Sequence, residues 1–85
     1  MSSELDTAII NNIQPIFQEL FLDDTLSISK KTSPETIEEW DSLAHISLLS
    51  AIEQELGIQF TAEDMSNIQD VAGMISTIKE RGYTG

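Results

Sequence analysis

The residues best suited to chemistry lie close together at Asp41, Ser42 and His45. The sequence predicts a helix over 42–56, with Asp41 as its N-cap and Gly57 as its left-handed stop. Ser42 then occupies the first helical position, where unpaired backbone N–H groups and the positive end of the helix dipole stabilise an attached phosphate. Ser42 is therefore chemically suited to carry a phosphodiester, although an additional capping serine is the simpler structural alternative.

His45 lies one helical turn after Ser42, a spacing that also suits a nucleophile and its base. The sequence offers no third residue to orient the ring and no GxSxG elbow, so we interpret His45 as a polar residue at the edge of the core or at the mouth of a cavity. Trp40 is interpreted as an apolar lid that packs the preceding loop onto the bundle, with a contact to a partner as the alternative.

Helical phase gives the predicted 42–56 helix two faces. The core-facing arc holds His45, Leu48, Leu49, Ile52 and Leu56, whereas the outer arc holds Leu43, Ser47, Ala51 and Gln54. Leu43 is therefore a large apolar side chain that we expect to point to solvent, directly beside Ser42. None of the residues of the outer arc is a carboxylate.

The elements that must position this site are predicted to be helices, because apolar residues recur at three- and four-residue steps rather than alternating. One apolar stripe predicts a first helix that ends near residues 23–24, with a kink or a restart near Pro15; it contains Leu5, Ile9, Ile13, Ile16, Phe17, Leu20 and Phe21. A long loop follows over 23–40, pinned to the core by Leu26, Ile28 and Ile37.

Two shorter helices complete the expected fold. A capping box of Thr61 and Asp64 starts a short helix that carries Met65 and Ile68, and Asp70 caps a last helix. That last helix faces inward with Val71, Met74, Ile75 and Ile78. We therefore expect one domain over 1–85: an all-α, antiparallel four-helix bundle with a short third helix and a long loop between the first two helices.

Composition excludes several functions. The 15 acidic and 4 basic residues give a net charge of −11, which repels phosphate backbones and anionic membranes. Apolar runs fall far short of the ~20 residues needed to cross a bilayer, and the first residues lack the order of a signal peptide. Cysteine is absent. We expect a cytoplasmic protein that binds no nucleic acid and does not insert into membranes.

The acidic residues themselves have two interpretations. Glu35, Glu38, Glu39 and Asp41 form either a solvated face or, together with Glu53, Glu55, Glu63 and Asp64, a rim that docks on basic partners. A calcium-binding EF-hand is excluded, because a loop starting at Asp23 places Ile28 where glycine is needed and Pro34 where the bidentate Glu should be.

At Asp41-Ser42-Leu43 the sequence resembles the acyl carrier protein family, which has an Asp-Ser-Leu at the start of its second helix. The similarity extends through Glu38–Leu49 and Glu53–Ile58, and continues at Phe60–Asp64 and Asp70-Val71, so that it covers nearly the whole chain. In that family the serine carries 4′-phosphopantetheine taken from coenzyme A, and acyl groups travel on its thiol as thioesters. The resemblance implies that Ser42 is the attachment site, with Asp41 and Leu43 beside it.

The resemblance also implies a function and a set of partner enzymes. It predicts a non-enzymatic, monomeric carrier in fatty-acid, polyketide or another specialised biosynthesis. Its partners would be a phosphopantetheinyl transferase and acyl-activating, condensing or acyltransferase enzymes with basic docking patches. The outer face of the 42–56 helix has Ala44, Ser47, Ser50 and Gln54 where fatty-acid carriers often have carboxylates or a methionine, which favours a specialised pathway. The alternatives are a peptidyl or aminoacyl carrier and an unmodified helical adaptor.

Overall fold

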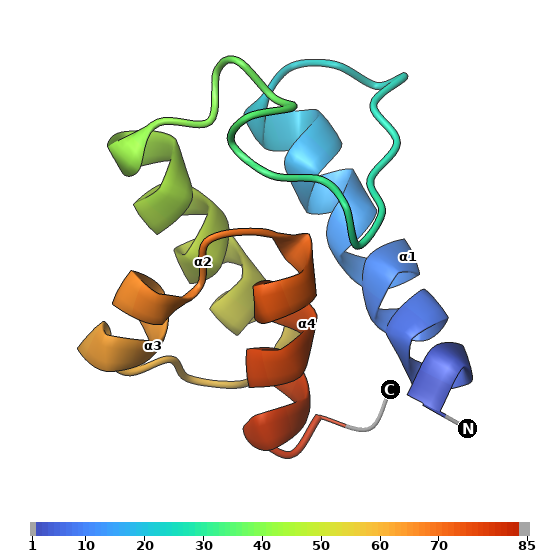
Figure 1. Cartoon of the computed structure of the whole chain (residues 1–85), viewed down its shortest axis with the longest axis vertical. Coiled ribbons are helices and arrows are strands. Elements are labelled where there is room, and N and C mark those ends of the chain that lie inside the picture. Colours follow the sequence, from blue (N-terminus) through green and yellow to red (C-terminus); the bar gives the residue numbers. More distant parts are fainter. Residues whose placement is uncertain (1, 84–85) are drawn as a thin grey trace.

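The computed structural model describes residues 2–83, with side chains from residue 4 onward. Its helices are α1 (Ser2–Leu20), α2 (Ser42–Leu56), α3 (Ala62–Asn67) and α4 (Val71–Glu80), and this described part of the chain has no strand. Figure 1 shows α1 and α2 running in opposite directions, with the long connection between them at one end of the molecule. The predicted all-α bundle with a short third helix is confirmed.

Helix α1 contributes one fully buried stripe to the core, formed by Ile9, Ile13 and Phe17. The helix runs through Pro15, so the alternative of a restart at that residue is wrong. We attribute its continuity to the stripe, which buries apolar side chains on both sides of the proline.

The end of α1 differs from the prediction. The helix ends at Leu20 rather than near residues 23–24, because Leu22 adopts a left-handed backbone with φ 53°. The Asp23 N–H then donates to the Gln18 carbonyl at 2.9 Å and closes the last turn.

The loop of residues 21–41 is fastened to the bundle by apolar and polar contacts. Ile28 and Ile37 are buried, and Leu26 packs partly buried against the core, as predicted. Two side chains one turn apart on α1 bind the loop backbone: Gln14 Oε1 accepts from the Ile28 N–H at 3.0 Å, and Gln18 Nε2 donates to the Leu26 carbonyl at 2.9 Å. These contacts fasten residues 26–28 to α1.

An ion-pair cluster adds a second fastening. The buried Asp6 carboxylate of α1 binds Lys30 of the loop and Lys79 of α4. Hydrogen bonds from Lys30 and then Lys79 lower the pKa of Asp6 below its ordinary value. Nearby, the Val71 N–H at the start of α4 donates to the Thr32 carbonyl at 3.0 Å. The loop is therefore tied to both α1 and α4.

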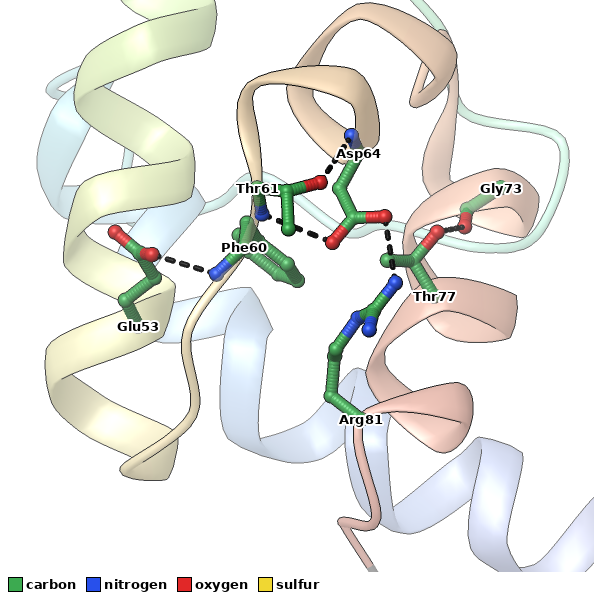
Figure 2. A network of polar contacts seen from close by, with 7 residues as sticks. All are labelled: Glu53, Phe60, Thr61, Asp64, Gly73, Thr77 and Arg81. Carbon is green, nitrogen blue, oxygen red and sulfur yellow. Dashed lines mark hydrogen bonds and ion pairs between the residues drawn. The ribbon is translucent and has the colours of Figure 1, made fainter.

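Helix α3 is held between α2 and α4 by the polar network in Figure 2. Glu53 Oε2 of α2 accepts from the Phe60 N–H at 2.7 Å just before α3 begins. Thr61 and Asp64 form the predicted capping box, and Arg81 after α4 donates to Asp64 Oδ1 at 2.8 Å. The backbone N–H of Thr61 and then Arg81 lower the pKa of Asp64. This network fixes the position of α3 relative to α2.

Candidate functional site

Ser42 is exposed at the first position of α2, as the sequence predicts. Asp41 has an extended backbone, and its Oδ1 accepts from the Ala44 N–H at 2.9 Å. Its carbonyl accepts from the His45 N–H, also at 2.9 Å. Over residues 2–83 the N–H groups of Ser42 and Leu43 have no hydrogen-bond partner. The hydroxyl therefore stands beside two free donors at the positive end of a 15-residue helix.

Trp40 lies under this site as the predicted lid. Its side chain is buried, and its ring meets Phe17 of α1 edge-on with centroids 5.4 Å apart. Its Nε1–H donates to Nδ1 of His45 at 3.0 Å, and the two rings are stacked. Trp40 thus connects the end of the loop to α1 and α2.

His45 continues this chain of contacts to α3. Its Nε2 lies 3.1 Å from the Met65 carbonyl. Because Nδ1 accepts from Trp40, we assign the neutral tautomer with the proton on Nε2, which donates to Met65. The prediction of a histidine at the core edge fits this arrangement. Both ring nitrogens are occupied, so neither is available as a base for Ser42. We call these contacts the Trp40–His45–Met65 bridge.

A groove of about 620 Å³ opens beside Ser42. The loop, α2 and α3 all contribute to its walls, with mostly apolar side chains around the rings of Trp40 and His45; six of its lining residues are Pro34, Trp40, Ser42, Ile46, Ala62 and Met65. The Trp40–His45–Met65 bridge joins three of these walls. An apolar group attached near Ser42 can therefore lie along the groove.

The exposed face of α2 includes two large apolar residues. Leu43 is 77% exposed, as predicted, and Leu48 and Leu49 are fully buried on the opposite side. Ile46 is 55% exposed and lines the groove, which the sequence analysis did not identify. Its position between the inner and outer arcs of the helix was the available signal.

The acidic residues divide into two groups. Glu35, Glu38, Glu39 and Asp41 are all exposed just before Ser42. Of the residues that the sequence grouped with them, Glu55 and Glu63 are also exposed, whereas the carboxylates of Glu53 and Asp64 accept backbone hydrogen bonds at the start of α3. Within residues 2–83, no three His, Asp or Glu side chains converge as a metal site. None of the described helices has the length and apolar character needed to cross a membrane.

No family model and no curated protein matches this sequence. Among solved structures, the chain is similar to a holo acyl carrier protein from Geobacter metallireducens determined by NMR in solution. The TM-score is 0.77 at 26% sequence identity, and the match covers 85% of this chain and 83% of the other.

This similarity identifies the class of protein. The chain has the four-helix fold of acyl carrier proteins. As the Asp41-Ser42-Leu43 motif and its neighbouring segments predict, the chain resembles the acyl carrier protein family.

Proposed function

We propose that this protein is a carrier that receives 4′-phosphopantetheine on the Ser42 hydroxyl and presents acyl thioesters to biosynthetic enzymes. The observation that carries the proposal is the placement of Ser42. It is exposed at the start of α2 and lines an apolar groove, in a fold that matches a holo acyl carrier protein.

The residues present fit such a group. A phosphodiester on Ser42 would lie beside the free N–H groups of Ser42 and Leu43, where the helix dipole favours negative charge. Asp41 caps the helix through Ala44 and so fixes where α2 begins, directly before the serine. The groove along Trp40 and Ile46 can shelter an apolar chain from water.

The pantetheine arm supplies a reactive group that the side chains of this protein lack. The chain has no cysteine, and the pantetheine arm supplies the thiol on which thioesters form. The tether keeps the acyl group at high effective concentration for a docked enzyme. We assign His45 no catalytic role in this proposal, because both of its ring nitrogens are hydrogen-bonded.

Intact-mass analysis tests this proposal. The protein is incubated with coenzyme A, Mg²⁺ and a broad-specificity phosphopantetheinyl transferase, and we expect a gain of one phosphopantetheinyl group. Ser42→Ala should abolish the gain and keep the fold, because Asp41 still caps the helix. Ser47→Ala is the matched control on an exposed serine of α2 and should load normally.

Two results would reject the proposal. No mass gain in the unaltered protein would favour the unmodified adaptor. An arm mapped to Ser47 or Ser50 would show that the site is misassigned. If loading succeeds, competition between acyl-activating and aminoacyl-activating enzymes for the holo protein separates an acyl carrier from an aminoacyl carrier.

A further inference from the structure

Leu22 combines two features that are unfavourable for the isolated protein. Its backbone is left-handed with φ 53°, a conformation that favours glycine, and its side chain is 92% exposed. It is the only non-glycine residue of the described chain with positive φ and also the most exposed of its large apolar side chains. Glycine at this position would avoid both costs.

Hydrogen bonds on both sides hold this conformation. Toward α1, the Asp23 N–H donates to the Gln18 carbonyl at 2.9 Å, and the Leu22 N–H donates to the Glu19 carbonyl at 3.4 Å. After it, Asp23 Oδ1 accepts from the backbone N–H of Thr25 at 3.1 Å and from its hydroxyl at 2.6 Å. The leucine is thus presented to solvent on a fixed backbone, which reduces the entropy lost when it enters a pocket.

The surroundings of Leu22 indicate the chemistry of its partner. Glu19, Asp23 and Asp24 are all exposed around it. The Thr25 hydrogen bonds lower the pKa of Asp23, which keeps that carboxylate charged. A second copy of this chain would bring these carboxylates against one another, which opposes self-association through Leu22. An apolar pocket bordered by Lys or Arg is complementary to both the leucine and its acidic border.

The position of Leu22 identifies which enzyme it would meet. Figure 1 places the C-terminal end of α1 and the N-terminal end of α2 at the same end of the molecule, joined by the loop. An enzyme that modifies the Ser42 hydroxyl itself must bind at this end. Enzymes that act on the end of a long arm have no such requirement.

Building on the proposed function, we propose that Leu22 is a docking anchor for the phosphopantetheinyl transferase that loads Ser42. It fills an apolar pocket on that enzyme, and the carboxylates of Glu19, Asp23 and Asp24 face basic residues around the pocket. In this role Leu22 contributes to binding and not to the reaction at the hydroxyl, so its loss raises KM and leaves kcat unchanged.

Loading kinetics test this inference with a broad-specificity phosphopantetheinyl transferase. The carrier concentration is varied at saturating coenzyme A, and product is followed by intact mass. For Leu22→Gly we expect KM to rise about tenfold to a hundredfold at constant kcat, the range for loss of one buried apolar anchor. The melting temperature should stay the same or rise, because glycine relieves the left-handed strain.

Three further variants separate anchoring from structure. Leu22→Asn tolerates the left-handed backbone but is polar, so its KM should rise as in Leu22→Gly. Leu22→Met keeps an apolar side chain and should retain a KM within about twofold. Gln59→Ala changes an exposed residue in the loop after α2, at the end of that helix away from Ser42, and should leave KM unchanged.

Each contrary outcome has a distinct meaning. If the unaltered protein does not load, the proposed function fails. If it loads and Leu22→Gly has the same KM, only the docking role of Leu22 is rejected. A dimer of the unaltered protein in sedimentation velocity that is lost in Leu22→Gly would assign the residue to self-association and would also overturn the inference.

Discussion

Replacing His45 with phenylalanine tests whether the Trp40–His45–Met65 bridge holds the walls of the groove together. Phenylalanine keeps a ring that can pack against Trp40, but it removes the Nδ1 acceptor and the Nε2 donor. Trp40 is only 5% exposed, so its Nε1–H loses its partner where water has little access. The Met65 carbonyl loses its partner as well.

The expected loss can be worked out from these contacts. Each hydrogen bond contributes about 0.5–1.5 kcal/mol, and a buried donor left without a partner costs about 1–3 kcal/mol. Together these values predict a fall in the free energy of unfolding of about 2–4 kcal/mol. Since a domain is stable by about 0.05–0.15 kcal/mol per residue, this is a large share of the total for a chain of this length.

Urea denaturation measures this loss directly. The chain has one tryptophan, and it belongs to the bridge, so its fluorescence reports both unfolding and local rearrangement. With a slope of about 1–2 kcal/mol per M urea, the midpoint should fall by about 1–4 M. The control is Trp40→Phe with and without His45→Phe, followed by circular dichroism. The double-mutant cycle should give a coupling of about 1 kcal/mol between the two residues.

A small effect would refute this reasoning. If the free energy of unfolding of His45→Phe lies within about 0.5 kcal/mol of that of the unaltered protein, the change behaves like an ordinary surface substitution. The hydrogen bonds of the bridge would then add nothing to stability. The groove would be held by apolar packing of Trp40 alone.

Three further expectations follow from other contacts. Leu43→Ala should cost less than about 0.5 kcal/mol in urea melts because the side chain is exposed, whereas Leu49→Ala should cost about 2–5 kcal/mol because it is fully buried; equal losses would contradict the observed helical phase. Hydrogen bonds from Lys30 and Lys79 lower the pKa of Asp6 below its ordinary 3.8, so the ionised Asp6 stabilises the fold fully above pH 3.8 and this contribution disappears as the pH falls through the lowered pKa. Asp6→Asn should therefore flatten the acid end of a plot of unfolding free energy against pH. Raising salt from 0.01 to 0.1 M shortens the Debye length from ~30 to ~10 Å and should raise the melting temperature of a chain with net charge −11, and a flat or falling value would be inconsistent with self-repulsion.

The parts of the fold that sequence predicts well are those with local causes. Helix α2 begins and ends where Asp41 and Gly57 predict, because a side-chain cap and a left-handed glycine act within one turn. The sequence also predicted the capping box of Thr61 and Asp64, which the structure contains. The exposure of Leu43 follows from helical phase, which needs only the position of the core face.

The features that sequence missed depend on contacts between distant segments or on an unusual residue choice. His45 could be placed at the core edge, but its bond to Met65 requires knowing how α3 lies against α2. Nothing in the composition indicates that Glu53 binds the Phe60 N–H rather than facing solvent. The first helix was predicted too long because Leu22 stands where a glycine would have marked the stop.

The placement of the cations explains how the surface before Ser42 stays negative. No Lys or Arg occurs in residues 32–78, the span that includes the end of the loop, α2 and α3. Three of the four basic residues, Lys30, Lys79 and Arg81, form ion pairs with Asp6 and Asp64, and the fourth, Lys31, is exposed in the loop. None of these ion pairs involves Glu35, Glu38 or Glu39. A basic enzyme approaching Ser42 therefore meets carboxylates that have no ion-pair partner in the described part of this chain, so its own Lys and Arg residues supply the compensating charge.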